Sequence, residues 1–385
     1  MKIPVRCGAL MCALLFKSTI ALFAMKEPPA EARTPISAVP FTISEAGSYY
    51  LTGNLTASDS TSGITISADN VTLDLNGFAL IGGGSGSVAG IVVPVAQKNL
   101  CIRNGTVRGW TNGGVRADTA RNSRLENLRV SNNSGDGNNG AAGLVAGPGS
   151  SVKNCVAADN PALPGIRTLD GCTIVDCTAS GNGLGGITGG NNVTVSHCTA
   201  SDNVAVGINV VTNSLVTGCT SSGNSVDGIV TSYGCTVSDC TAGGNGRFGI
   251  YADQGSVVRG CNATLNVGSG IVVTAICHVT GNTCDENSHG GALVQSGLRA
   301  IGNSNRIEGN SSTFTYNGGT GIEVLGHFNL IIRNSARGNG TNYSIAADNR
   351  YGPIINITAN GTSAVSGNSA VSTVASTDPW ANFAY

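Results

Sequence analysis

From residue 40 onward, aliphatic and polar residues alternate in short runs, and turn-forming Gly and Asn separate one run from the next. Alternation over so few residues favours half-buried β-strands, because the apolar face of a helix recurs every three or four residues. The pattern therefore predicts an all-β chain of short strands joined by tight turns.

One period organises these strands. A Gly before a small or aliphatic residue recurs with one step of 22 residues and then steps of 21, at Gly143, Gly165, Gly186, Gly207, Gly228, Gly249, Gly270 and Gly291. A cysteine row keeps the same phase, at Cys155, Cys177, Cys198, Cys219, Cys240 and Cys261. So does an asparagine row, at Asn160, Asn182, Asn203, Asn224, Asn245, Asn266 and Asn287. Three residue types in one phase predict a solenoid with about 21 residues per coil.

Stacking explains why like residues recur. Successive coils pair in parallel at ~4.8 Å, so each side chain lies above its counterpart one coil earlier. We expect the asparagines to occupy a turn, where Asn tolerates left-handed backbone and its amide can bind the next Asn. The Gly that follows permits close approach of the backbone. Two aliphatic columns should point inward, at Ile166, Ile187, Ile208, Ile229, Ile250 and Ile271, and at Ile174, Val195, Val216, Val237, Val258 and Val279.

The repeat extends beyond its most regular part. Looser copies precede it at Gly63, Gly90 and Gly114, and others follow at Gly321 and Leu330. We predict about a dozen coils in a single domain, residues 33–385. Residues of about 40–56 should cap its N-terminal end, and about 360–385, with Trp380, Phe383 and Tyr385, should form an aromatic C-terminal cap.

Residues 1–32 have the features of a signal peptide. Lys2 and Arg6 precede two apolar runs, and Ala30-Glu31-Ala32 has the small-x-small form of a cleavage site. An uncleaved anchor is the alternative, but neither apolar run is long enough to span a bilayer. We therefore expect a secreted, periplasmic or cell-surface protein without a transmembrane segment in its mature form.

The order Gly-Ile, inward aliphatic, Cys-Thr-Ala and Gly-Asn within one coil resembles the repeat of the pectin-lyase-like superfamily, and most closely its NosD-like and unassigned bacterial members. The resemblance covers nearly all of the chain after residue 40. It implies a right-handed parallel β-helix. It leaves function open, because lyases, hydrolases, epimerases, adhesins and proteins of no known activity share this fold.

Composition excludes some partners. Charged residues are 11% of the chain and the net charge is −1, with Lys and Arg scattered. Because there is no basic stripe to neutralise phosphates, we expect no nucleic-acid partner. We expect no cofactor, and the oligomeric state stays open.

The cysteines are expected to be small buried side chains. Cys172, Cys235 and Cys277 form a further row that also accepts Val193 and Ser214. Disulfides are an alternative in an exported protein, although stacked Cβ vectors run parallel rather than toward each other. No CxxC pair exists, so we expect no zinc site.

Acidic residues show no catalytic arrangement, so catalytic residues remain unassigned. A calcium-dependent lyase site would need acids stacked on neighbouring coils. Here Asp176 and Asp239 share a register three coils apart, and the others are scattered, at Asp159, Asp202, Asp227, Asp253, Asp285 and Glu286. Ser288-His289-Gly290 and Arg306-Ile307-Glu308 only partly match the Gly-His-Gly and Arg-Ile-Lys of polygalacturonases.

The surface offers three features. Insertions at about 134–142 and 311–320 should project from the same turn and wall off about seven coils, ~34 Å. An outward row becomes apolar, along Arg167, Thr188, Asn209, Val230, Tyr251, Val272 and Leu293, and we expect the C-terminal tail to cover it. A Thr-x-Ser face runs along Thr178, Thr199, Thr220 and Thr241.

These observations favour a non-catalytic exported protein that contacts polysaccharide or has a structural or adhesive surface role. A polysaccharide lyase or glycoside hydrolase is the first alternative. A structural or ice-binding solenoid is the second.

Overall fold

The computed structural model describes residues 33–356, except 59, 85, 87, 136–139, 290–294 and 314–318, and also residues 378–384. The predicted signal peptide and most of the predicted C-terminal cap lie outside the described residues. Residues 33–385 are grouped as one compact unit.

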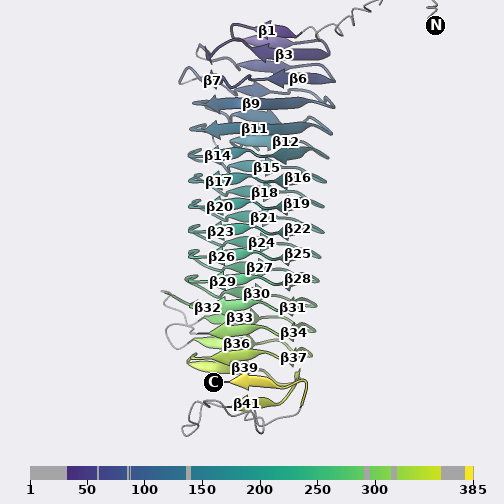
Figure 1. The fold of residues 1–385 in the computed structure, drawn as a ribbon, viewed down its shortest axis with the longest axis vertical. Helices are drawn as coiled ribbons and strands as arrows, with labels where there is room; N and C mark the ends of the chain where they lie inside the picture. Colours follow the sequence, from purple (N-terminus) through teal and green to yellow (C-terminus); the bar gives the residue numbers. More distant parts are fainter. Residues whose placement is uncertain are drawn as a thin grey trace, which may run out of the picture. The chain divides into compact units, whose positions relative to one another are not determined.

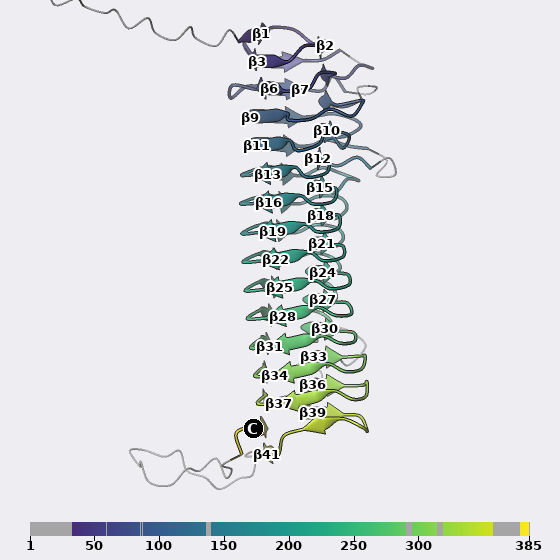
Figure 2. The same ribbon diagram turned by 90° about the vertical axis from the view of Figure 1, so that its right-hand side faces the viewer.

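The described chain is a parallel β-solenoid built from two long sheets (Figures 1 and 2). Each regular coil gives one strand to the 14-stranded sheet, called sheet B, and then two strands to the 28-stranded sheet, called sheet A. Fourteen strands in sheet B agree with the predicted dozen or so coils. Among the described residues every regular element is a strand.

Sheet B contains β2 (Phe41–Ile43), β5 (Ile64–Ile66), β8 (Ile91–Val92), β10 (Val115–Ala117), β12 (Leu144–Ala146), β15 (Ile166–Thr168), β18 (Ile187–Gly189), β21 (Ile208–Val210), β24 (Ile229–Thr231), β27 (Ile250–Ala252), β30 (Ile271–Val273), β33 (Ser296–Ala300), β36 (Thr320–Val324) and β39 (Thr341–Ile345).

The first position of each coil in sheet A is held by β3 (Gly47–Leu51), β6 (Val71–Asp74), β9 (Cys101–Arg108), β11 (Arg124–Ser131), β13 (Ser151–Lys153), β16 (Thr173–Val175), β19 (Thr194–Ser196), β22 (Leu215–Thr217), β25 (Thr236–Ser238), β28 (Val257–Arg259), β31 (His278–Thr280), β34 (Arg306–Glu308), β37 (Leu330–Ile332) and β40 (Arg350–Tyr351). The second position, into which β9 and β11 also run, is held by β4 (Leu55–Thr56), β7 (Ala79–Ile81), β14 (Val156–Ala158), β17 (Thr178–Ser180), β20 (Thr199–Ser201), β23 (Thr220–Ser222), β26 (Thr241–Gly243), β29 (Asn262–Thr264), β32 (Thr283–Asp285), β35 (Ser311–Thr313), β38 (Ser335–Arg337) and β42 (Asn382–Ala384). The remaining strands are β1 (Thr34–Ile36), which pairs with β3, and β41 (Ile354–Asn356), which pairs with β42.

The core is the pair of predicted aliphatic columns. Ile187 pairs with Ile208 on sheet B, Val195 pairs with Val216 on sheet A, and all four side chains are fully buried. A third column of small residues, which includes Ala179 and Ala200, faces inward from the second strand of each coil. Burial of these columns in every coil supplies the main driving force for folding.

The predicted asparagine row is a buried ladder. Nδ2 of Asn182 donates to Oδ1 of Asn203 at 2.9 Å, and the backbone N–H of Asn182 donates to the same oxygen at 3.1 Å. Each amide thus satisfies the inward polar groups of the turn above it. A Cβ on Gly186 would lie 2.7 Å from Nδ2 of Asn203, which explains the Gly that follows each ladder Asn.

The left-handed residue of this turn is not the ladder Asn, as we expected, but the residue before it. Asp159, Gly181, Asp202 and Gly223 occupy that row with φ between 52° and 65°. Gly, Asn and Asp adopt this conformation most easily, so the row selects them. Several of the acidic residues considered for catalysis are therefore turn residues.

The cysteine rows occupy the two other inward turns. All eleven cysteines of the described chain are free and buried. The backbone N–H of Cys219 donates to Sγ of Cys240 at 3.4 Å, and that thiol donates to the carbonyl of Ser238 at 3.1 Å. In most coils these positions therefore carry a hydrogen-bonding side chain that is also small, with Val193 as an exception.

Both ends of the stack are made of paired strands. Residues 40–56 contribute β2, β3 and β4, in parallel register with the next coil. At the other end, β42 lies between β38 and β41, so the chain returns to complete the last coil. Trp380 precedes this strand and lies near the end of sheet A, away from Tyr251, so the described part of the tail does not cover the outward row as we expected.

No helix that could cross a membrane occurs among the residues the structure describes.

Candidate functional site

One row of side chains, one per coil, points outward from the middle of the strands of sheet B, and within it Val272 is only 2% exposed. The row runs Arg167, Thr188, Asn209, Val230, Tyr251 and Val272, as predicted. The next member is Arg299 rather than Leu293, because Ile271 pairs with Leu298 and not with Ala292. Leu293 itself lies outside the described residues. The row therefore becomes charged again after Val272 instead of ending in an apolar side chain.

The first predicted insertion lies next to this face. It separates β11 from β12, and its described residues lie against the next coil: a Cβ on Gly135 would be 2.9 Å from Leu163, and one on Gly140 would clash with the guanidinium of Arg167. The Asp136-Gly137-Asn138-Asn139 segment lies outside the described residues. The insertion thus leaves the solenoid beside Arg167, the first residue of the row.

The second insertion was predicted one coil too late. Asn310 is not in the row of Asn287; its Oδ1 accepts the backbone N–H of Asn282, which itself follows Cys261. The longer connection is the one between β32 and β33, residues 286–295, which is ten residues against the six that join β29 to β30 in a regular coil. The two long connections therefore flank β12 to β30 of sheet B.

A charged and aromatic cluster occupies the middle of this face. Asp227 is fully buried, Nε of Arg247 donates to its Oδ1 at 2.8 Å, and the guanidinium also pairs with Oδ2. The backbone N–H of Phe248 donates to the same carboxylate at 2.9 Å. The guanidinium of Arg247 lies over the Phe248 ring, 4.9 Å from its centroid. Asp227 thus fixes the loop that carries both side chains.

Tyr251 completes the cluster from β27. Its ring stacks on Phe248, with centroids 6.3 Å apart and planes 17° from parallel. Partial burial, and secondarily the Asp253 carboxylate, raise the pKa of Tyr251 above its ordinary value. Tyr251 is therefore a neutral hydroxyl at pH 7 that can donate a hydrogen bond. Asp253 accepts a hydrogen bond from Thr274 at 2.8 Å.

An ion pair marks the C-terminal end of the face. Nε of Arg299, on β33, lies 2.8 Å from Oε2 of Glu323 on β36. Ser296 donates to that oxygen at 2.8 Å, and Nη1 of Arg299 donates to Gln295 at 3.3 Å. Glu323 is thereby engaged by two neighbours.

The catalytic candidates do not converge. Asp176, Asp239 and Glu286 sit at left-handed turn positions. Ser288 is buried and His289 is exposed, and Glu308 lies on sheet A between two arginines. In the described part of the chain, no three His, Cys, Asp or Glu side chains are arranged to hold a metal ion.

Sequence reasoning missed the Asp227–Arg247 pair. The two residues are 20 positions apart, one less than the coil, which puts them side by side on adjacent coils. A search for opposite charges at offsets of 20 to 22 residues would have found the pair.

Comparison with known proteins agrees with this architecture. A family model described as "Right handed beta helix region" matches residues 142–288 and 188–336, which together span more than half of the chain. No curated protein sequence matches the chain.

Two groups of solved structures are similar. The A-module of mannuronan C-5 epimerase AlgE4 from Azotobacter vinelandii is 17% identical, with a TM-score of 0.56, and the match covers 79% of this chain and 90% of the module. Tailspike protein 3 of bacteriophage CBA120 is 14% identical, with a TM-score of 0.51, covering 82% of this chain and 59% of the tailspike. At these identities the likeness shows the fold alone. The chain belongs to the right-handed parallel β-helix family, of the pectin-lyase-like type.

Proposed function

We propose that this protein is exported and binds an acidic polysaccharide along the outward face of sheet B without cleaving it. The single observation that carries the proposal is the Arg247–Phe248–Tyr251 cluster, in which Asp227 holds Arg247 and Phe248, on the face between the two long connections.

Each part of the face suits such a polymer. Stacked aromatic rings provide a flat apolar surface for a sugar ring, and Arg side chains bind carboxylates. Arg167 lies four coils before Tyr251, or ~19 Å at 4.8 Å per coil, so the cationic and aromatic positions would contact separate sugar units. The parallel stack repeats its polar groups at nearly constant spacing, as an extended polymer does.

The absence of cleavage is inferred from the state of the carboxylates. Glycoside hydrolysis uses two carboxyl groups about 5–10 Å apart that flank the scissile bond. On this face Asp227 is buried under Arg247, Asp253 accepts a hydrogen bond from Thr274, and Glu323 is paired with Arg299. None of these three is placed as an unengaged acid beside a second one.

The structural neighbours are compatible with the proposal but do not carry it. One is named as an epimerase of mannuronan, a polysaccharide, and another is a phage tailspike.

A structural or ice-binding solenoid remains the second candidate because the Thr-x-Ser face exists. Thr178, Thr199, Thr220 and Thr241 stack in register on sheet A, and their side chains are half-buried or exposed. Thermal hysteresis of the purified protein would favour that role.

Binding to a carboxylated polysaccharide and to a neutral one, at low and high salt, tests the proposal. We expect Tyr251→Ala and Arg167→Gln each to weaken binding of the acidic polymer about tenfold, or ~1.4 kcal/mol. Arg259→Gln, on sheet A, is the matched control and should leave binding unchanged. Equal affinity of all four proteins would show that sheet B is not the binding face.

A further inference from the structure

Basic residues are concentrated near the N-terminal end of the stack. Residues 34–97 and 168–246 contain no Lys or Arg, whereas residues 98–129 contain seven, at Lys98, Arg103, Arg108, Arg116, Arg121, Arg124 and Arg129. These cations are spread along the chain, but the coil period brings four of them together in space. With Lys153 they occupy the outward side of β9, β11 and β13 in sheet A, at Arg103, Arg108, Arg124 and Arg129.

Strand alternation directs these cations into solvent. Arg108, Arg124 and Arg129 are exposed, and their neighbours along the strands are fully buried, at Val107, Leu125, Leu128 and Val130. Arg129 pairs with Thr106, which lies two residues before Arg108 on the adjacent coil. The Cα atoms of Arg108 and Arg129 are therefore ~8 Å apart, and both side chains leave the same face.

Acidic side chains neutralise only part of this face. The outward carboxylates of β6, β9, β11 and β13 are Asp74 and Glu126. Asp74 is already shared, because Nη2 of Arg33 and Nε of Arg103 each lie 3.2 Å from its Oδ2. Within the described part of the chain no ion pair engages the side chains of Arg108, Arg124, Arg129 or Lys153. The face thus carries a local positive charge that the net charge of −1 for the whole chain conceals.

A groove of about 310 Å³ lies beside Arg129 on this face. Its lining includes Arg129, Thr106 and a column of amides from three successive coils, at Asn104, Asn127 and Asn154. Nδ2 of Asn127 donates to Oδ1 of Asn104 at 3.0 Å, and Nδ2 of Asn154 donates to Oδ1 of Asn127 at 2.7 Å. An amide has two N–H donors, so each of these groups keeps one for a ligand.

The combination of groups suits an anion that also carries hydroxyl and ether oxygens. A guanidinium binds a carboxylate with two hydrogen bonds, and the amide column donates to the oxygens of the same chain along ~10 Å of the stack. Among the described residues that line the groove, none is aromatic. Single-stranded nucleic acids bind largely by stacking their bases on aromatic rings, so they fit this groove less well.

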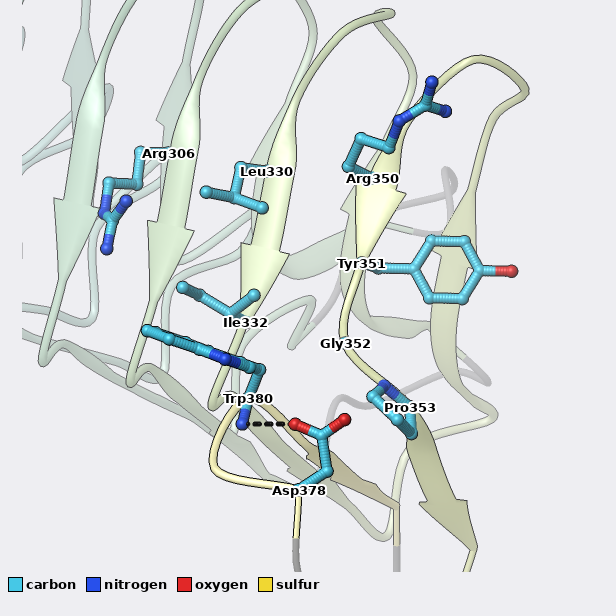
Figure 3. Close-up of a pocket in the computed structure, with 9 residues that line it drawn as sticks. All are labelled: Arg306, Leu330, Ile332, Arg350, Tyr351, Gly352, Pro353, Asp378 and Trp380. Atoms are coloured by element: carbon cyan, nitrogen blue, oxygen red, sulfur yellow. Dashed lines mark hydrogen bonds between the residues drawn. The ribbon is translucent and has the colours of Figure 1, made fainter.

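The cavity at the opposite end of sheet A lacks this convergence. Tyr351 and Arg350 point away from Trp380 there (Figure 3), and the guanidinium of Arg333 already covers the indole, 4.4 Å from the centre of its rings. The N-terminal groove differs because its amides and its guanidinium line one concavity.

We propose that this face of sheet A is a second binding site for an acidic glycan, with one carboxylate on Arg129 beside the amide column and the next acidic unit near Arg108. Arg124 and Lys153 add long-range attraction for the polymer. The choice of ligand class rests on the proposed function, but the site is separate, because it shares no residue with the sheet B face. One molecule could then hold two glycan chains.

Calorimetric titration of the full-length mature protein with trigalacturonate counts the sites. A trisaccharide cannot reach both sheets, so we expect two to bind per protein chain, more weakly at high salt, and maltotriose as the neutral probe to bind less tightly. Arg129→Gln should raise the dissociation constant of one site about tenfold, and Tyr251→Ala that of the other. Arg259→Gln, on the outward side of β28, is the matched control and should change neither.

Asn127→Gly tests the amide column by itself. Asn127 has φ of 56°, and Gly218 holds the same row four coils later with φ of 61°, so glycine removes the amide and keeps the left-handed turn. The variant should weaken the site that Arg129→Gln weakens, about fivefold. Asn213→Gly, with φ of 56° in the turn between β21 and β22, is the control and should bind as the wild type does.

The outcomes separate the two sites. A single site that Tyr251→Ala weakens and Arg129→Gln does not would overturn the proposal for sheet A and leave the sheet B face standing. A single site with the reverse response would support sheet A and contradict the sheet B face. No binding of trigalacturonate would contradict both. Tighter binding of a single-stranded oligodeoxythymidylate, or of phosphatidylglycerol vesicles, that Arg129→Gln weakens would overturn the choice of a glycan.

Discussion

The backbone N–H of Cys261 donates to Oδ1 of Asn282 at 2.9 Å, in the same turn where, two coils earlier, the N–H of Cys219 donates to Sγ of Cys240 at 3.4 Å. A single row thus changes from cysteine to asparagine without a change of role, and it continues through Asn310, Asn334 and Asn382. In the neighbouring turn, Cys277 is followed by Asn305 in the same way. In these coils the inward turn position carries a side chain that accepts a buried N–H, whereas Val193 shows that the neighbouring row also tolerates an apolar residue.

Substitutions at Cys240 test this role. Cys240→Ala leaves the N–H of Cys219 without its acceptor in the core, so we expect it to lower the free energy of unfolding by about 1–3 kcal/mol. Cys240→Ser keeps an acceptor and should cost clearly less. Urea denaturation of both variants gives the comparison. If alanine were tolerated as well as serine, the cysteines would be simple space-filling residues.

The asparagine ladder should be less tolerant. Oδ1 of Asn224 accepts the N–H of Asn203 at 3.1 Å, and its Nδ2 donates to Asn245 at 3.0 Å. Asn224→Ala leaves polar groups unsatisfied on both neighbouring coils, and we expect a loss of about 3 kcal/mol. Asn209→Ala, on the outward face of β21, is the control and should cost under ~1 kcal/mol. Equal losses at these two positions would contradict a structural role for the ladder.

The buried thiols should make the free energy of unfolding depend on pH in the alkaline range. Burial is the main cause that raises the pKa of Cys172, Cys235 and Cys277 above the ordinary value of 9.0. A thiol whose pKa is raised in the folded state contributes its full stabilisation below about pH 9, and this contribution is lost as the pH rises further. The free energy of unfolding should therefore fall above about pH 9, by up to ~1.4 kcal/mol per pH unit for each thiol. Replacing these three cysteines by serine should make the dependence shallower but not remove it, because burial also raises the pKa of Cys101 and Cys284. An unchanged slope would assign the dependence to other groups.

The Asp227–Arg247 pair should respond asymmetrically to mutation. The Asp227 side chain is fully buried, whereas that of Arg247 is 56% exposed. Arg247→Met leaves the buried Asp227 carboxylate without its counter-ion and should lower the free energy of unfolding by about 3 kcal/mol or more. Asp227→Asn leaves a guanidinium that water can solvate, so its loss should be smaller. Chemical denaturation of the two variants measures the difference. A larger loss in Asp227→Asn would contradict the view that Arg247 chiefly neutralises a buried charge.

The sequence predicts the regular part of the fold almost residue by residue. A one-residue slip would turn every inward side chain outward, so the aliphatic columns at Ile187 and Val195 fix the register. The second insertion was misplaced for a physical reason. Asn310 and Asn287 are the same residue type in two different turns, and both turns select an inward hydrogen-bonding side chain.

The candidate sites were predictable only in part. The outward row on sheet B follows from the period as far as Val272. The position of Trp380 does not follow from the period, because it depends on the return of β42 between β38 and β41, which no repeat encodes. The Asp227–Arg247 pair required knowing which residues of adjacent coils lie side by side.

The most direct test of the account is to incubate the purified mature protein with acidic and neutral polysaccharides, with and without calcium, and to measure polymer length and co-elution by size-exclusion chromatography. We predict that an acidic polysaccharide co-elutes with the protein and keeps its length, with or without calcium. Shortening of any polymer would contradict the non-catalytic account, and a calcium requirement would then favour a lyase-like site over a hydrolase. If no polymer shortened and none co-eluted with the protein, polysaccharide binding itself would be contradicted, and a purely structural solenoid would be favoured.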